Sequence, residues 1–227
     1  MMAHVGARWT RRQICAAVAA AVLSLVIPAR GWTADYSAAV VADLTSGQVL
    51  FSHAAEEPRF PASLTKMMTL YLLFEDLERG RLSLESPLVV SDYAAAQVPT
   101  KLGLRGGEAI RADDAIRALV THSANDAAVT VAENLEGGEP AFAARMTRTA
   151  HQLGMTGTQF RNASGLPDPN QYSTAWDMMV LGAALQSRFP RYFAYFKTGS
   201  FSFRGRTYRN HNHLLGRIDG EIGRAHV

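Results

Sequence analysis

The stretch PASLTKMMT, residues 61–69, places a serine and a lysine three positions apart at the start of an apolar segment. Apolar residues recur behind it at three- and four-residue spacing as far as Gly80, which predicts one helix beginning at Ser63. Residues i and i+3 of a helix lie on one face, so the side chains of Ser63 and Lys66 can meet.

Ser63 and Lys66 together offer the chemistry of nucleophilic catalysis. A serine hydroxyl is a poor nucleophile until a base removes its proton. A lysine acts as that base only when it is neutral, which partial desolvation favours. A helix start also brings backbone N–H groups near the negative charge that develops during attack. Taken alone, however, Ser-x-x-Lys is more often an ordinary helix cap followed by a solvated lysine.

A second polar triplet, Ser123-Ala124-Asn125, interrupts a helical pattern. The helix before it is expected to begin at residues 113–114, and the helix after it, capped by Asp126, to run to Leu135. A hydroxyl and an amide on one side of a tight turn can relay a proton from Lys66 and hold a substrate amide. The alternative is that Asn125 and Asp126 are helix caps and nothing more.

The rest of the chain alternates between hairpin and helix patterns, which predicts one α+β domain. Turns at Thr45-Ser46-Gly47 and Arg204-Gly205 each join two β-like runs. Pro and Gly punctuate Leu82–Gly107, and its last part, Lys101–Gly107, is expected to be an exposed loop. The expected strands are 39–44, 48–51, 200–203 and 206–208; the further helices are 113–120, 126–135 (ended by Gly137-Gly138), 141–153 and 174–185, with a loop at 162–167.

Residues 1–31 have the order of a signal peptide. Three arginines (8, 11 and 12) precede an apolar run from Ile14 to Ile27, and small residues stand at the −3 and −1 positions of a cut after Gly31. A cut after Ala34 fits as well. A membrane anchor needs about 20 apolar residues, and this run is shorter. We therefore expect export.

Removal of this segment changes the charge and the cysteine count. It holds four of the 23 Lys and Arg residues and no acid, which leaves 19 basic against 20 acidic residues. This balance gives no reason to expect a nucleic acid partner. The single cysteine, Cys15, leaves with the segment, so no disulfide or cysteine metal site is expected. His211 and His213 lack a third ligand at a suitable spacing and are expected to decorate a strand end.

The two motifs together resemble those of the penicillin-recognising serine acyltransferases, which carry Ser-x-x-Lys, Ser-x-Asn and Lys-Thr-Gly. The similarity is closest to the low-molecular-mass penicillin-binding proteins that are D-alanyl-D-alanine carboxypeptidases, serine peptidase family S11. Such a resemblance implies a transpeptidase-like (β-lactamase-like) α+β fold, with an antiparallel sheet flanked by helices and a helical subdomain. The resemblance covers about residues 36–220. The segments that carry it are 61–69, 123–128, 153–155, 160–166 and 173–177.

The resemblance also implies a mechanism and a place of action. Ser63 would attack the carbonyl between the two terminal D-alanines of a peptidoglycan pentapeptide, and Lys66 would accept its proton. Ser123 would pass that proton to the leaving D-alanine, and Asn125 would bind the substrate backbone. β-Lactams would inhibit by acylating Ser63. The enzyme would act in the periplasm and would need no metal or cofactor. A segment beyond this sequence could associate it with the inner membrane.

Lys197-Thr198-Gly199 has the letters of the third signature, and we predict that it is a decoy. In the resembled family an Asn-x-Asn-x-Leu-Leu segment precedes that motif, whereas here the corresponding residues 210–215 follow Lys197. By this alignment the true motif would begin near position 225, where the sequence ends. We therefore expect residues 32–220 to be a partial catalytic domain with an incomplete sheet and little activity, and residues 221–227 to be an artefactual tail.

Other functions stay open at this point. A β-lactamase shares the Ser-x-x-Lys tetrad but needs a deacylating carboxylate, and residues 162–170 contain no Glu. An inactive fragment that binds penicillin or cell wall is a second alternative, and endopeptidase activity on cross-linked peptides is a third. Arg204, Arg206 and Arg209 are expected to form a solvated hairpin face, with an anionic wall polymer as the alternative contact.

Overall fold

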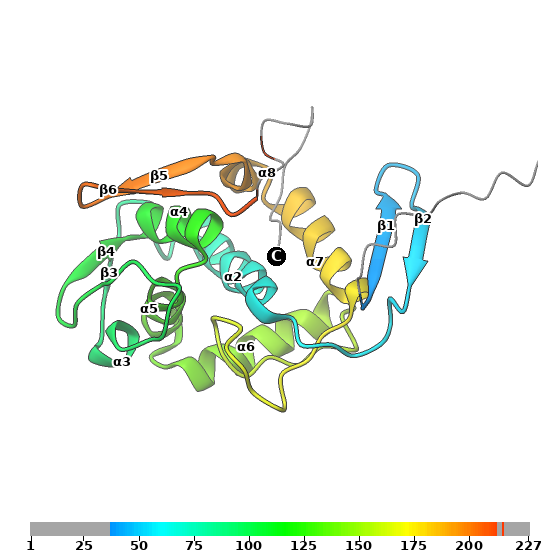
Figure 1. Ribbon diagram of the computed structural model, residues 1–227, viewed down its shortest axis with the longest axis horizontal. Helices are drawn as coiled ribbons and strands as arrows, with labels where there is room; N and C mark the ends of the chain where they lie inside the picture. The colour runs from blue at the N-terminus through cyan, green and yellow to red at the C-terminus, as the bar shows by residue number, and fades with distance from the viewer. Residues whose placement is uncertain (1–36, 213–214, 216–227) are drawn as a thin grey trace, which may run out of the picture. The chain divides into compact units, whose positions relative to one another are not determined.

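The described part of the chain consists of helices and three short hairpins (Figure 1). The structure, a computed structural model, describes residues 37–212 and 215, so the predicted signal peptide and tail lie outside the described residues. The helical elements are η1 Ala62–Thr65, α2 Lys66–Glu78, α3 Asp92–Ala95, α4 Ala112–His122, α5 Asn125–Glu136, α6 Glu139–Gln152, α7 Ala175–Arg188, α8 Pro190–Phe193 and η2 Ala194–Lys197. The strands are β1 Ala39–Asp43, β2 Gln48–His53, β3 Pro87–Val89, β4 Ala109–Arg111, β5 Ser200–Phe203 and β6 Arg206–Arg209.

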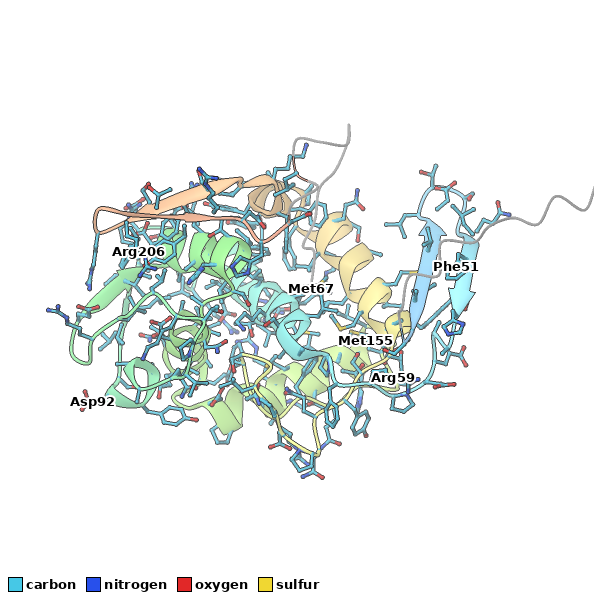
Figure 2. The ribbon with its side chains drawn as sticks, viewed as in Figure 1. Phe51, Arg59, Met67, Asp92, Met155 and Arg206 are labelled. Atoms are coloured by element: carbon cyan, nitrogen blue, oxygen red, sulfur yellow. The ribbon has the colours of Figure 1, made fainter. Side chains whose placement is uncertain are left out.

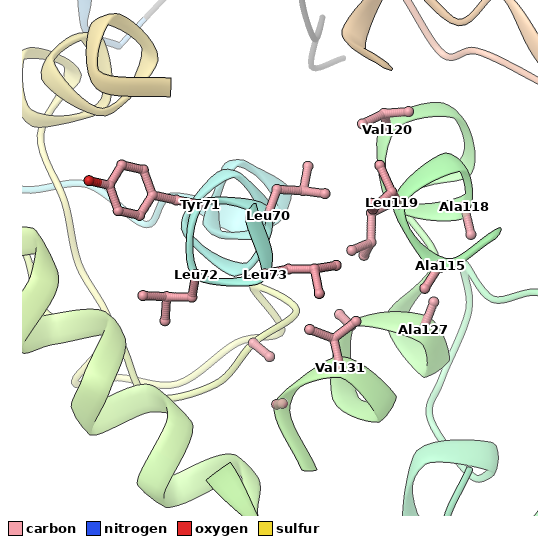
Figure 3. Packing of buried hydrophobic residues seen from close by; sticks show 14 of the residues in the cluster. Leu70, Tyr71, Leu72, Leu73, Ala115, Ala118, Leu119, Val120, Ala127 and Val131 are labelled. Carbon is pink, nitrogen blue, oxygen red and sulfur yellow. The ribbon is translucent and has the colours of Figure 1, made fainter. Parts of the chain in front are cut away.

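Helix α2 is packed against α4, α5, α6 and α7. Leu70 and Leu73 point toward α4 and α5, and Tyr71 and Leu72 point to the opposite side of the helix (Figure 3). Ten of the thirteen residues of α2 are buried. Seven of the eight residues from Met67 to Phe74 are apolar, and a helix that is apolar all round is buried on all sides. Helix α2 is therefore the centre of the core.

The strands pair as three separate antiparallel hairpins, β1–β2, β3–β4 and β5–β6. The first and the third confirm the hairpins predicted from the turns at Thr45-Ser46-Gly47 and Arg204-Gly205. Every residue of β2 is exposed, including the aromatic Phe51, which Figure 2 labels on the first hairpin. None of the helices described is long and apolar enough to cross a membrane.

The segment Leu82–Gly107 is more ordered than predicted. It contains α3 and β3, which pairs with β4; strands of three residues are too short to give a recognisable alternation. Lys101–Gly107 was expected to be an exposed loop, and this is wrong for two of its residues. Leu102 and Leu104 are 9% and 4% exposed, because the two leucines enter the core while Gly103 between them and residues 105–107 stay exposed.

The break between α4 and α5 comprises Ser123 and Ala124, two of the three residues predicted for it, and α5 ends at Glu136, which is followed by Gly137 with a φ of 73°. The prediction that Asp126 caps α5 is wrong. The N-cap is Ala124, so Asp126 is the second residue of the helix, and its carboxylate mainly accepts hydrogen bonds from another segment. The helix starts earlier than expected because the backbone N–H of Asn125 is held by the carbonyl of Thr100.

A buried guanidinium joins three of the helices. Arg145 of α6 has a side chain that is 10% exposed and contacts Asp76 and Glu75 of α2 at 2.7 and 3.0 Å. It also contacts Glu136 of α5 at 2.8 Å. Removing one partner of a buried ion pair leaves the other charge without compensation in a low-dielectric environment. The arginine therefore fixes α6 to the helix that carries Lys66.

The substitution Arg145→Met should lower the free energy of unfolding by about 3–5 kcal/mol, because Asp76 would stay buried without its main cation. Urea unfolding followed by circular dichroism measures this loss. Arg148→Met on the same helix is the control, since Arg148 is exposed, and its effect should stay within about 0.5 kcal/mol. Equal losses in the two variants would contradict the role given to Arg145.

Candidate active site

Ser63 lies in a 3-10 turn, and its side chain is partly exposed. The predicted start of the α-helix at Ser63 is therefore three residues too early, because the α-helical pattern begins only at Lys66. Short 3-10 turns are common at helix ends and keep residues i and i+3 on one side. Ala62 enters the turn with a φ of 45°, a left-handed value that non-glycine residues rarely adopt.

Lys66 is fully buried at the first position of α2. Its Nζ donates a hydrogen bond to Oδ1 of Asn125 at 2.8 Å and another to the backbone oxygen of Ser164 at 2.5 Å. The alternative of a solvated lysine after a helix cap is therefore wrong. Removal from water favours the neutral form of an amine, which can accept a proton from a serine, whereas the two oxygens that accept from Nζ favour the charged form.

Ser123 and Asn125 flank the break between α4 and α5. Ser123 has a φ of 57°, and its side chain is 6% exposed. No hydrogen-bond partner for its Oγ exists among the described residues. A buried hydroxyl without a partner is uncommon, and among the described residues Thr65 carries the other such hydroxyl. Asn125 is 5% exposed, and its Nδ2 donates to the backbone oxygen of Val98 at 3.0 Å. Asn125 therefore contacts Lys66, which the sequence did not predict, whereas the predicted proton relay between Lys66 and Ser123 stays a prediction.

The loop at residues 162–167, for which no role was predicted from spacing, completes the surroundings of Lys66. Besides Ser164, the neighbouring Ala163 accepts a hydrogen bond at its backbone oxygen from Thr69 of α2 at 2.7 Å. Asn162 fixes the loop, because its Oδ1 accepts from the N–H of Gly165 at 2.7 Å. The contacts use backbone oxygens, so the identity of the side chains in this loop carried no signal beyond its turn-forming Asn and Gly.

Gly165 packs directly against the turn that carries Ser63. Its φ is 86°, and a Cβ built on it would lie 1.8 Å from the backbone oxygen of Ala62 and 3.0 Å from the nitrogen of Ser63. Both the backbone conformation and the close approach require a residue without a side chain. Gly165 is therefore a second residue of the site that spacing alone did not indicate.

Lys197-Thr198-Gly199 lies at the end of η2, ahead of β5, and the Lys197 side chain is exposed. The backbone oxygens of Thr198 and Gly199 accept hydrogen bonds from the side chain and backbone of Asn210, at 2.9 and 2.8 Å. These residues are not part of a strand. The interpretation of this triplet as a decoy stays a prediction, and its position outside a strand favours it.

Two histidines near Ser123 contact aromatic rings. The His122 ring centroid lies 4.6 Å from that of Tyr208 and 5.5 Å from that of His211. Burial lowers the pKa of His122, and the nearby His211 and Arg206 lower it further. His213, the other half of the metal alternative, lies outside the described residues. Within residues 37–212, no group of three His, Cys, Asp or Glu side chains is arranged to hold a metal ion.

The arrangement combines a partly exposed serine, a buried amine one turn away and a second buried hydroxyl beside the asparagine that binds the amine. A buried amine can take the proton of Ser63, and a second hydroxyl can pass a proton to a leaving group. This set of groups suits attack on a carbonyl with transfer of the acyl group to the serine.

Comparison with known proteins points to one family. A model of the peptidase S11 family, described as D-alanyl-D-alanine carboxypeptidase, matches residues 28–222 of the chain. The chain is 34% identical over 187 residues to the D-alanyl-D-alanine carboxypeptidase DacD of Salmonella typhimurium. The matched region covers 80% of this chain and 48% of that protein. The chain spans about half the length of the curated relatives that it matches.

Solved structures give the same result. Penicillin binding protein 5 from Haemophilus influenzae is similar with a TM-score of 0.75 and 31% identity, over 78% of this chain and 53% of that chain. Penicillin-Binding Protein D2 from Listeria monocytogenes in the ampicillin-bound form is similar with a TM-score of 0.69 and 31% identity, over 82% of this chain and 76% of that chain. The predicted transpeptidase-like α+β fold is confirmed.

The substitution Gly165→Ala should destabilise the protein and disturb Ser63, because the new Cβ would overlap the backbone of Ala62, which cannot move away as a side chain can. We expect about 1–3 kcal/mol for this overlap, in addition to about 1–2 kcal/mol for the left-handed backbone. Urea unfolding gives the loss of stability.

Gly205→Ala is the matched control. Gly205 also has a positive φ, 76°, but no atom lies within 4 Å of the position of its missing Cβ. Its loss should be limited to the cost of the backbone conformation. If both variants lose the same free energy, the close packing of Gly165 on the nucleophile turn has no energetic importance.

Proposed function

The chain belongs to the S11 family of D-alanyl-D-alanine carboxypeptidases, and from this we propose that the protein removes the terminal D-alanine from peptidoglycan stem peptides through an acyl-enzyme on Ser63. The observation that carries the proposal is the buried amine of Lys66, one turn after Ser63 and hydrogen-bonded to Asn125 at 2.8 Å. An amine kept from water beside a serine is the arrangement that a serine–lysine nucleophile needs.

In the first half of the reaction, neutral Lys66 takes the proton of the Ser63 hydroxyl. The Ser63 oxygen then forms a bond to the carbonyl carbon of the penultimate D-alanine. When the C–N bond breaks, the proton passes from Lys66 through the Ser123 hydroxyl to the amine of the leaving D-alanine. In the second half, water loses a proton to Lys66 and attacks the ester carbonyl. The bond between that carbon and the Ser63 oxygen then breaks, Lys66 returns the proton to Ser63, and the shortened peptide is released.

Asn125 serves both the lysine and the substrate in this scheme. Its Oδ1 accepts the hydrogen bond of Lys66, and one hydrogen of Nδ2 goes to the backbone oxygen of Val98. A carboxamide nitrogen carries two hydrogens. The second one is the group that we assign to a backbone carbonyl of the stem peptide.

β-Lactams would acylate the same serine. The Listeria relative in the ampicillin-bound form supports this, as a strained amide presented to Ser63 would open by the same attack. The order of basic, apolar and small residues in 1–31 supports export to the periplasm, where the peptidoglycan substrate lies.

Incubation with a fluorescent penicillin, followed by mass spectrometry of the labelled peptide, should locate the adduct on Ser63. Ser63→Ala should abolish the label. Ser123→Ala should slow acylation by roughly 100-fold, in the range of a lost proton-transfer group. Ser46→Ala, in the exposed turn of the first hairpin, should leave the label unchanged.

A second assay separates the rival functions. Slow release of D-alanine from a peptide that ends in two D-alanines, together with a long-lived penicillin adduct, is the expected result, because Lys197-Thr198-Gly199 is not expected to supply the third signature. Rapid turnover of the penicillin without D-alanine release would indicate a β-lactamase. Absence of a label on Ser63 would leave only a wall-binding role and contradict the proposal.

A further inference from the structure

A seven-residue segment, Val98–Leu104, lies across the Ser123–Asn125 turn, and we name it the strap. Three hydrogen bonds connect the two. The backbone oxygen of Thr100 accepts from the N–H of Asn125 at 2.7 Å, and the Thr100 hydroxyl donates to the backbone oxygen of Ser123 at 3.1 Å. The backbone oxygen of Val98 accepts from Nδ2 of Asn125 at 3.0 Å. The strap thus fixes both the backbone and the carboxamide of Asn125.

The strap is itself held by one carboxylate. Asp126 is 0% exposed. Its Oδ1 accepts from the N–H of Leu102 at 3.0 Å, and its Oδ2 accepts from the N–H groups of Gly103 and Leu104 at 2.8 and 3.0 Å. Oδ1 also accepts from the N–H of its own neighbour Ala127 at 2.9 Å. Four N–H donors therefore share two carboxylate oxygens, and each such hydrogen bond is strengthened by the charge.

We propose that Asp126 is a positioning residue for the acyl-transfer site, which acts through the strap on Asn125 and through Asn125 on the Lys66 amine. The proposal rests on the proposed function in assigning a role to Lys66. The hydrogen bonds of the Asp126 carboxylate described above go to the strap and to Ala127. Its effect on the reaction would come from holding the strap in place, which in turn positions Oδ1 of Asn125, the acceptor of the Lys66 hydrogen bond.

An amide cannot replace the carboxylate here, although it has nearly the same shape. In Asp126→Asn, one oxygen becomes an NH2 group in either orientation of the side chain. That group then faces two N–H donors, either Leu102 with Ala127 or Gly103 with Leu104. Two N–H donors lose their acceptor. The loss raises the free energy of the conformation in which the strap lies across the turn, so the strap is held there less stably.

The test compares Asp126→Asn with Asp177→Asn. Asp177 is a second buried carboxylate, 4% exposed, in the first turn of α7. It accepts a hydrogen bond from the Thr158 hydroxyl at 2.6 Å. It has no described contact with the strap or with the Ser123–Asn125 turn. Both variants should lose stability, so global unfolding alone does not decide between a structural and a positioning role.

Two readouts decide. Acylation of Ser63 by a fluorescent penicillin should slow roughly 10- to 100-fold in Asp126→Asn, as expected for a misplaced catalytic geometry, and stay within about threefold of the original rate in Asp177→Asn. Amide hydrogen exchange measured by NMR should be faster at Asn125 in Asp126→Asn than in Asp177→Asn, once both are corrected for global stability.

Equal exchange at Asn125 in the two variants would overturn the positioning role, as would equal acylation rates. If the unsubstituted protein takes no label at all, the proposed function fails. The exchange at Asn125 then still decides whether Asp126 holds the strap in place, because that readout does not require catalysis.

Discussion

The buried amine of Lys66 requires hydrogen-bond acceptors, and this requirement brings together segments that are far apart in the sequence. Helix α2 is enclosed by four other helices, so its first residue is removed from water. A polar group in such a place is costly unless it is hydrogen-bonded. Asn125 and the backbone oxygen of Ser164 stand 59 and 98 positions away and supply the acceptors. The position of Ser63, one turn before the amine, is thereby fixed relative to both.

Two of the four described non-glycine residues with a positive φ lie at the same place, and the other two, Ala54 and Arg204, lie elsewhere. Ala62 and Ser123 have φ values of 45° and 57°, and neither is a glycine. Such conformations cost of order 1–3 kcal/mol each and persist only where the surroundings hold them. Gly165 packs against the carbonyl of Ala62, and the Thr100 hydroxyl binds the carbonyl of Ser123. The surroundings that hold the strained residues are thus the same loops that arrange Asn125 and Lys66.

The parts of this site that could be predicted are those with a local signature. Ser63 and Lys66 follow from their spacing at the start of an apolar helix, and the break at Ser123-Ala124 follows from the interrupted helical pattern. The roles of Ser164 and Thr100 could not be predicted, because they act through backbone oxygens, which every residue possesses. The burial of Leu102 and Leu104 was missed for a related reason. Glycines around them indicated a loop, and only the tertiary structure shows that this loop passes over the core.

A site held together by backbone oxygens tolerates some side-chain substitutions and not others. The side chains of Val98 and Ser164 do not make the hydrogen bonds that hold Asn125 and Lys66, so their replacement leaves those bonds available. What the bonds do require is the path of the chain. That path depends on Gly165, which alone permits the close approach to Ala62, and on the four donors gathered by Asp126. Residues that set the path of the loops therefore constrain the chemistry as strongly as the residues that take part in it.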